Sequence, residues 1–146
     1  MKCYAVIDTN VVVSAFLSVM KKSNLDESVP YKVLSIVLNG KNKITPIFND
    51  EILDEYKEVL SREEFKISKS IIGRFLNNIR DVGETVEAAK IDEVVSDPKD
   101  VVFYRVVMGG KEVQDSYLVT GNKKHFPIRE FVVSPSEFIE IVEKNK

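Results

Sequence analysis

The sequence predicts an α/β fold in which helices cover both faces of a central parallel β-sheet, a three-layer α/β/α sandwich. Apolar, β-favouring segments alternate along the chain with segments whose apolar residues recur at helical spacing. Residues 4–7 are apolar at every position, which is typical of a strand buried on both faces. Asp8 follows directly, and a second apolar run occupies residues 11–17. Asp8 is therefore expected where a buried strand gives way to a helix, at the sheet edge where ligands bind in such folds.

The later elements follow from capping residues and apolar spacing. Helices are expected to begin at Ser28, Asn49, Ser68, Asp97 and Ser134. Strands are expected at residues 44–47, 116–120 and 131–133, and a short strand followed by a loop is favoured within 84–91.

Several details of these elements can also be predicted. Residues 18–27 are polar and predict a loop, and Pro46 favours a strand end or a sheet edge. Gly109 and Gly110 are expected to end the helix that begins at Asp97.

Length and composition indicate one globular domain spanning residues 1–146. Of the 146 residues, 44% are hydrophobic and 30% are charged, the balance of an ordinary globular protein. No internal repeat, low-complexity tract or linker divides the chain. We therefore expect no second domain.

Charge and cysteine content restrict the class of protein further. A formal net charge of −2 excludes a global positive field, so a nucleic-acid site must be a local basic patch or depend on bound cations. The single cysteine, Cys3, is typical of a reducing compartment. The apolar run of residues 11–17 is too short to span a membrane and does not resemble a signal peptide. We expect a cytoplasmic protein with no membrane partner.

Acid or amide side chains occur at four places that could face one sheet edge. Asp8 follows the first strand, and Glu55 borders the apolar stripe of its predicted helix. Asp97 and Asp100 stand at the start of another helix. The segment 120–122 follows a strand that Asp115 precedes.

Each place alone has a simpler explanation. Asp8 and Asp97 are also good helix caps, and capping is the better interpretation of Asp97. Glu55 alone would be one of several solvated acids on an amphipathic helix. Spacing leaves Asp100 evenly divided between a first-turn acid and a site residue.

Together, the four places indicate a site for a divalent metal ion. Carboxylates gathered in one cleft repel one another unless a cation or protons neutralise them. Mg²⁺ and Mn²⁺ prefer such oxygen ligands, and they assist phosphodiester hydrolysis. The chain lacks a Gly-rich phosphate loop and a cysteine–histidine cluster, and its only histidine is His125. We expect His125 to be a loop residue rather than a metal ligand.

The order of four short motifs resembles the PIN domain family across residues 4–142. These motifs are Ile7-Asp8-Thr9-Asn10, the segment 55–62, Asp97-Pro98-Lys99-Asp100, and Leu118-Val119-Thr120-Gly121-Asn122. The resemblance is greatest to the branch of toxin components of toxin–antitoxin pairs. It implies an α/β/α sandwich and a Mg²⁺- or Mn²⁺-dependent ribonuclease that cleaves single-stranded RNA. It also implies a homodimer and a protein antitoxin as partner.

The resemblance also implies the site residues. Asp8, Glu55 and Asp100 match the three family acids that hold the metal. Asn122 falls where many members carry a fourth acid, and Thr120 matches the hydroxyl residue before it. Since an amide adds no negative charge, a second metal position should be weaker, and Asp97 or Asp115 are candidates to replace the missing acid.

Basic residues near the acids are candidates for holding the RNA backbone. Lys123, Lys124 and Arg129 follow Asn122 and are the first choice, with Arg62 as a further candidate. Tyr104 and Arg105 stand where relatives often have small residues. They are expected either to narrow the cleft or to place Arg105 near a phosphate.

Two other functions remain open from the sequence. The first is a catalytically weak PIN-fold module that binds RNA or a protein. The second is a phosphohydrolase acting on small molecules, which ranks last because haloacid-type phosphatases need a second acid where this chain has Asn10.

Overall fold

Five parallel strands form one sheet in the computed structural model, which describes residues 2–21, 25–39 and 43–145. The strands are β1 (Cys3–Ile7), β2 (Ile44–Phe48), β3 (Glu84–Thr85), β4 (Ser116–Val119) and β5 (Val132–Val133). Their spatial order is β3-β2-β1-β4-β5, so the chain moves outward from β1 to β3 and then returns to β4 on the other side of β1. The direction of winding therefore reverses between β1 and β4, and their carboxyl ends form a crevice of the kind that binds ligands.

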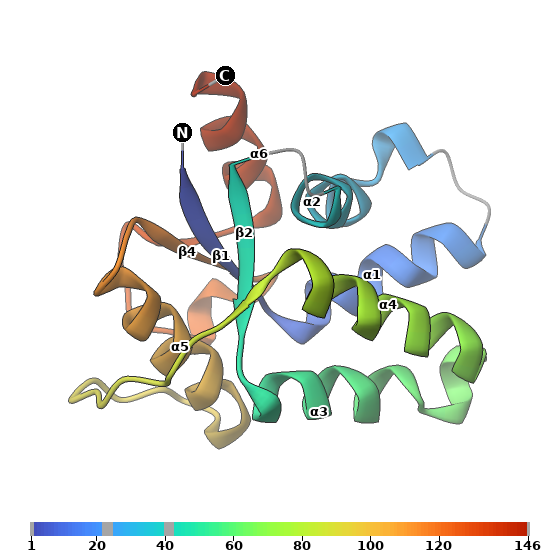
Figure 1. The fold of residues 1–146 in the computed structure, drawn as a ribbon, viewed down its shortest axis with the longest axis horizontal. Helices are drawn as coiled ribbons and strands as arrows, with labels where there is room; N and C mark the ends of the chain where they lie inside the picture. Colours follow the sequence, from blue (N-terminus) through green and yellow to red (C-terminus); the bar gives the residue numbers. More distant parts are fainter. Residues whose placement is uncertain (1, 22–24, 40–42, 146) are drawn as a thin grey trace.

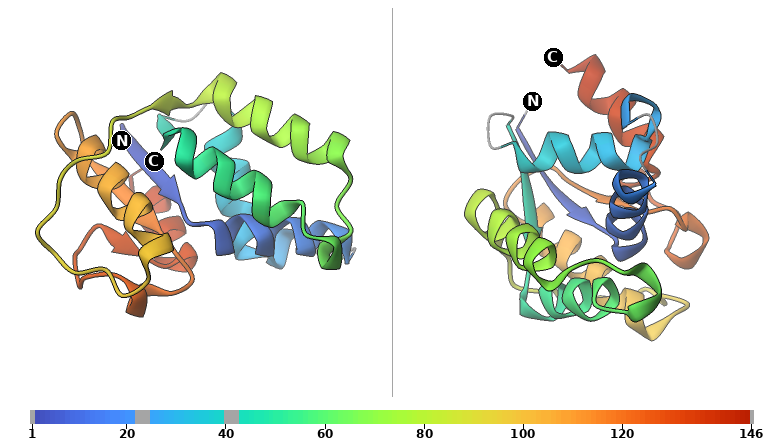
Figure 2. Two further views of the ribbon diagram at one scale, coloured as in Figure 1. Left: turned by 90° about the horizontal axis from the view of Figure 1, so that it is seen from below. Right: turned by 90° about the vertical axis from the view of Figure 1, so that its right-hand side faces the viewer.

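Helices cover both faces of this sheet, as predicted (Figure 1). They are α1 (Thr9–Met20), α2 (Val29–Leu38), α3 (Asp50–Leu60), α4 (Lys69–Val82), α5 (Val101–Lys111) and α6 (Pro135–Lys144). On one face, α5 packs against β1, β2 and β4, whereas α2 lies on the other face in contact with α1 and α6. The helices α3 and α4 run side by side beside β2 (Figures 1 and 2).

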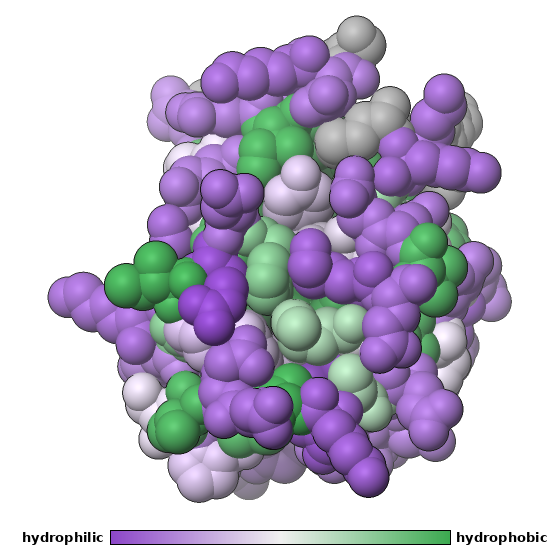
Figure 3. Space-filling view, turned by 90° about the vertical axis from the view of Figure 1, so that its left-hand side faces the viewer, coloured by the Kyte–Doolittle hydropathy of each residue, from purple (hydrophilic) through white to green (hydrophobic). Residues whose placement is uncertain are grey.

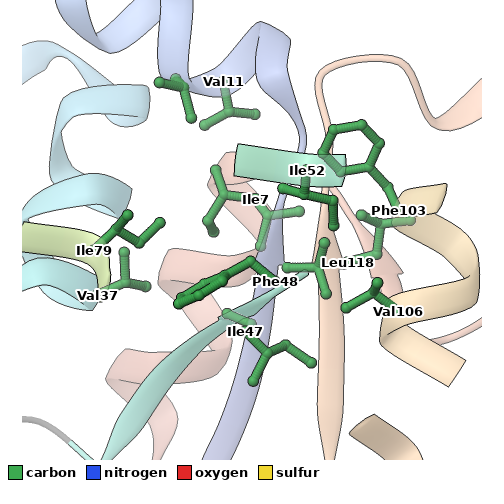
Figure 4. Packing of buried hydrophobic residues seen from close by; sticks show 14 of the residues in the cluster. Ile7, Val11, Val37, Ile47, Phe48, Ile52, Ile79, Phe103, Val106 and Leu118 are labelled. Atoms are coloured by element: carbon green, nitrogen blue, oxygen red, sulfur yellow. The ribbon is translucent and has the colours of Figure 1, made fainter. Parts of the chain in front are cut away.

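Apolar side chains from the central strands and the surrounding helices form the core (Figure 4). All five residues of β1 are buried, because helices cover both of its faces. Ile7 and Leu118, from neighbouring strands, lie near Phe103 of α5 in this core (Figure 4). Removal of this apolar surface from water fixes the strand ends, and with them the position of Asp8.

The predicted helix caps are present, with one informative exception. The side chains of Ser28, Asn49, Ser68, Asp97 and Ser134 each accept a hydrogen bond from a backbone N–H of the turn that follows. Ser134 and Glu137 complete a capping box. Asp8 occupies the N-cap position of α1, but its side chain makes no capping hydrogen bond. Its carboxylate is therefore directed to other partners.

Three details differ from the sequence-based expectations. Gly109 and Gly110 lie within α5 instead of ending it. Position 109 requires glycine because a Cβ there would lie 2.1 Å from the carbonyl oxygen of Glu87. Pro46 lies in an interior strand, which is tolerated since β3 pairs only with Ile47 and Phe48. The helix α1 extends through Met20 into the predicted loop.

The face that carries α5 and the segment 86–96 is largely hydrophilic, with small, separate hydrophobic areas (Figure 3). Across the described ranges, no helix combines the length and the apolar character that crossing a membrane requires.

Candidate active site

A cleft of about 440 Å³ lies at the carboxyl ends of β1 and β4. Asp8, Glu55 and Asp100, which come from three separate segments, all line it. Its other polar lining residues are Thr9, Asn10, Ser14, Arg62, Asp97, Lys99, Asn122 and His125. The structure thus brings the three predicted acids to one cavity, at the edge of the sheet where the sequence placed Asp8.

Asp8 is the most enclosed of these acids, with only 4% of its surface exposed. Its Oδ2 accepts hydrogen bonds from Oγ1 of Thr120 (2.7 Å) and from Nδ2 of Asn10 (3.2 Å). Burial raises the pKa of Asp8 to about 6, the hydrogen bond from Thr120 opposes this rise, and the charges of Asp100 and Glu55 add to it. A cation in the cleft would relieve both the repulsion and the cost of burying this charge.

The loop after β4 is tied to the start of α1 through Thr120 and Asn10. Thr120 is fully buried, and its Oγ1 also accepts a hydrogen bond from the backbone N–H of Asn122 (2.9 Å). The N–H of Gly121 donates to Oδ1 of Asn10 (3.0 Å). Thr120 therefore positions Asp8 and the loop together, and Asn122 is held at the edge of the cleft. The sequence motif contained Asn10, but its bridging role was not predicted.

Glu55 reaches the cleft from α3. Its Oε2 accepts a hydrogen bond from Oγ1 of Thr9 (2.5 Å), a contact that the sequence did not predict. The buried Tyr56 hydroxyl donates to the carbonyl oxygen of Ile7 (2.5 Å), which fixes α3 against the end of β1. Glu55 therefore faces the cleft. It is not simply a solvated acid on an amphipathic helix, which was the simpler interpretation.

Asp100 is held by His125. The Nδ1 of His125 lies 3.1 Å from Oδ2 of Asp100. Burial raises the pKa of Asp100, while the hydrogen bond and charge of His125 lower it and the charges of Asp97 and Glu55 raise it. His125 belongs to a loop, as expected, but its contact with Asp100 was not predicted. His125 ends a 3₁₀ turn that follows Asn122, and because residues three apart in such a turn lie on one side, both side chains line the cleft.

Of the two acids considered as replacements at position 122, only one lies at the cleft. Asp97 lines the cleft, and its Oδ1 accepts a hydrogen bond from the backbone N–H of Lys99 (2.9 Å), so it also caps its turn. Asp115 precedes β4 and lines a different hollow with Lys111 and Glu130. The suggestion that Asp115 replaces the fourth acid is wrong, because it stands at the amino end of a strand whose carboxyl end borders the cleft.

Only one of the four predicted RNA-binding residues lines the cleft. That residue is Arg62, which also pairs with Glu58 (3.3 Å). Lys123 instead pairs with Glu137 (2.8 Å), and Arg129 lies 3.6 Å from Glu93. Lys124 is exposed and has no ion pair with any described residue. Lys99, which was not among the predicted RNA-binding residues, does line the cleft.

Tyr104 and Arg105 do not narrow the cleft. The hydroxyl of Tyr104 donates to Glu93, and Nε of Arg105 donates to the carbonyl oxygen of Ala89 (2.7 Å). Both side chains instead attach the segment 86–96 to α5. The expectation that Arg105 lies near a substrate phosphate is therefore wrong.

The cleft suits a hard divalent cation by the chemistry of its donors. Asp8, Glu55 and Asp100 supply carboxylate oxygens and three negative charges, which such ions prefer. Among the described residues, however, no three acidic, histidine or cysteine side chains are close enough together to hold one ion. The acids therefore share a cavity and an electrostatic field without forming a closed coordination shell.

The parallel sheet, its covering helices and the acid-lined cleft define an α/β protein whose candidate active site lies where the winding reverses. A family model described as "PIN domain" matches residues 4–124. This match spans more than half of the chain, so the chain belongs to the PIN domain family, whose members are generally nucleases that use divalent metal ions. No curated protein and no solved structure gives a significant match.

Proposed function

We propose that this protein is a metal-dependent endoribonuclease that cleaves single-stranded RNA as the toxin of a toxin–antitoxin pair. The observation that carries the proposal is the convergence of Asp8, Glu55 and Asp100 on one cleft. These three acids are far apart in the sequence, so only the folded chain brings them together. Burial and the charges of the other two acids raise the pKa of Asp8, and this supports the proposal because a bound cation would offset both effects.

Mg²⁺ or Mn²⁺ is the proposed cofactor, held by Asp8, Glu55 and Asp100. When bound, such an ion lowers the pKa of a coordinated water and offsets negative charge on the phosphate. The hydroxyls of Thr120 and Thr9 keep Asp8 and Glu55 oriented, and His125 does the same for Asp100. These three are positioning residues in the proposal, because each acts through a carboxylate.

Cations at the rim of the cleft are the proposed contacts for the RNA backbone. Arg62 and Lys99 both line the cavity, Arg62 from just after the end of α3 and Lys99 from the turn before α5. They would hold the phosphates that flank the scissile bond against the repulsion of the acids. Lys124, two residues after Asn122, is a further proposed contact. The ion pairs of Lys123 with Glu137 and of Arg129 with Glu93 compete with phosphate for the charges of these two side chains.

A catalytically weak binding module is the second candidate function. Asn122 lines the cleft where many relatives carry a fourth acid, so the charge available to a second metal ion is smaller. A single weakly held ion would leave RNA binding intact while lowering turnover.

The proposed protein partners are an antitoxin and a second copy of the chain. Both proposals come from the family resemblance. An apolar hollow of about 480 Å³ supports them, because Phe16, Val19 and Ile71 line it between α1, α2 and α4. Val19 and Ile71 are each nearly half exposed, and exposed apolar areas commonly mark protein contacts.

A cleavage assay on labelled single-stranded RNA and DNA tests the main proposal. We expect cleavage of RNA with Mn²⁺ or Mg²⁺, none with a chelator, and products that carry 5′-phosphate and 3′-hydroxyl ends. Asp8→Asn should abolish cleavage while the circular dichroism spectrum is unchanged. Cleavage at the wild-type rate by this variant would refute the assignment, and RNA binding without metal-dependent turnover would favour the binding module.

A further inference from the structure

A second hollow, distinct from the cleft, lies between α3 and α4. It has a volume of about 440 Å³, and we call it the α3–α4 groove. Its lining residues are Lys57, Ser61, Lys69, Ile72, Gly73, Leu76, Asn77 and Arg80. Three of these are cations and none is an acid. The lining of the groove therefore carries three positive charges and no negative charge.

The three cations of the groove have no protein partner in the part of the chain that the structure describes. The side chains of Lys57, Lys69 and Arg80 take part in no ion pair or hydrogen bond there. Like charges that line one hollow repel one another, so an anion in the groove would be favoured. The hydroxyl of Ser61 and the amide of Asn77 add hydrogen-bonding groups suited to phosphate oxygens.

Gly73 leaves the floor of this groove open. It lies in the interior of α4, where glycine destabilises a helix relative to alanine. No close approach requires it, because a Cβ built there would meet no atom within 4 Å. The lack of a side chain at this position therefore enlarges the groove without serving the packing of α4.

The groove is elongated, which favours a polyanion over a single phosphate. Lys69 and Arg80 stand at opposite ends of α4, about 16 Å apart along the helix axis at the usual rise per residue. One phosphate group cannot contact both ends. The groove and the cleft also lie on opposite sides of α3, since Lys57 and Ser61 line the groove whereas Glu55 and Arg62 line the cleft. We propose that the α3–α4 groove is a second binding site, which takes the sugar–phosphate backbone of single-stranded nucleic acid.

This inference deepens the proposed function, since it assigns RNA a second contact on the same protein, but binding tests it without any cleavage. The probe is a fluorescent single-stranded oligouridylate of about 15 nucleotides. Its affinity is measured by anisotropy over a range of salt concentrations, with chelator present, in the Asp8→Asn background so that no RNA is cut. Inorganic phosphate and uridine monophosphate are added as competitors.

The groove variant changes Lys57, Lys69 and Arg80 to Gln. Its matched control changes Lys21, Lys32 and Lys144 to Gln, which alters the net charge equally on other helices and turns. The groove variant should bind RNA about tenfold more weakly or worse, and its salt dependence should fall by about 2 in the log–log slope, as expected for three lost phosphate contacts. The control should stay within about twofold of the parent. Equal affinities and slopes for the two variants would overturn the inference.

Gly73 supplies an independent pair of variants. Gly73→Met should fill the groove and weaken RNA binding, whereas Gly73→Ala should bind RNA normally and make the protein more stable. Full competition by phosphate or uridine monophosphate at low millimolar concentration would overturn the inference, because the ligand would then be a small phosphate compound. Metal-dependent cleavage is scored separately in the wild-type background, so a protein that binds through the groove but never cuts RNA would refute only the proposed function.

Discussion

The hydroxyl of Thr120 donates a hydrogen bond of 2.7 Å to Oδ2 of Asp8, which joins two buried side chains that are 112 residues apart in the sequence. The contact connects the carboxyl ends of β1 and β4, the two strands between which the winding of the sheet reverses. It stabilises the ionised form of a carboxylate that burial otherwise disfavours. The balance between these two effects sets the chemistry of the cleft, and it can be tested from either residue.

Replacing Asp8 by Asn should stabilise the metal-free protein near neutral pH. The pKa of Asp8 is about 6 in the folded protein, above the ordinary value of 3.8. Between these values the folded state binds more protons than the unfolded state, so the free energy of unfolding falls as pH rises through this window. Above this pH window the full cost of burying the ionised carboxylate remains. Removing the charge should therefore raise the free energy of unfolding by about 1–3 kcal/mol.

Urea denaturation of the wild type and of Asp8→Asn with chelator present, from about pH 4 to 7, measures this effect. The advantage of the variant should shrink toward the acidic end, where the wild-type carboxyl is protonated. Asp54→Asn, which changes an exposed acid on α3, is the control and should show no such trend. When Mn²⁺ replaces the chelator, it should stabilise the wild type but not Asp8→Asn. A constant difference between wild type and Asp8→Asn at every pH would contradict the pKa assignment.

Replacing Thr120 by Val should destabilise the protein and shift its pH dependence. Valine keeps the shape of the side chain but removes the donor to Asp8 and the acceptor for the N–H of Asn122. We expect a loss of about 1–3 kcal/mol near neutral pH. Since the lost hydrogen bond had lowered the pKa of Asp8, the acidic limb of the pH–rate profile should move to higher pH.

Thr120→Ser keeps the hydroxyl and is the matched control. It should preserve the position of the pH–rate profile even if the missing methyl group lowers stability. The Thr120 assignment would be wrong if the Val and Ser variants had the same profile.

The sequence predicted the backbone of the site well because local rules determine it. A strand apolar at every position must be buried on both faces, so the acid that follows it had to lie at the sheet edge. Capping residues such as Asn49 and Ser134 set the starts of the helices independently of tertiary contacts. Gly109 shows where a local rule fails, since this glycine allows a close approach of Glu87 to α5 and does not mark the end of the helix.

The basic side chains of the site could not be predicted in the same way, because long charged side chains are placed by their partners. Lys123 follows Asn122 closely, but the capping-box residue Glu137 pairs with it. Arg129 lies near Glu93, which also accepts a hydrogen bond from Tyr104. Lys99 was not among the predicted RNA-binding residues, yet it lines the cleft.

Replacing His125 by Ala should weaken the binding of Mn²⁺ to the RNA-free protein. The imidazole contacts Oδ2 of Asp100, one of the three proposed ligands, and partners of this kind commonly change metal affinity by about 10- to 100-fold. His125→Asn should retain most of the affinity, because its amide N–H₂ can replace Nδ1 as donor. Calorimetric titration with Mn²⁺ compares the three proteins. Equal Mn²⁺ affinities for wild type and His125→Ala would show that the contact does not position Asp100.

Replacing both Arg62 and Lys99 by Ala should raise KM for RNA more than it lowers kcat. Both side chains line the cleft, so their removal takes away proposed contacts to the RNA phosphates next to the acids. We expect about a tenfold rise in KM near physiological salt, and a smaller rise at high salt, where phosphate contacts contribute less. Lys124→Ala, which removes an exposed cation outside the cleft lining, is the comparison. Initial rates over a range of RNA concentrations at two salt concentrations measure both constants. A larger effect from Lys124→Ala than from the double variant would place the substrate backbone on the loop after β4, as the sequence alone had suggested, and away from Arg62 and Lys99.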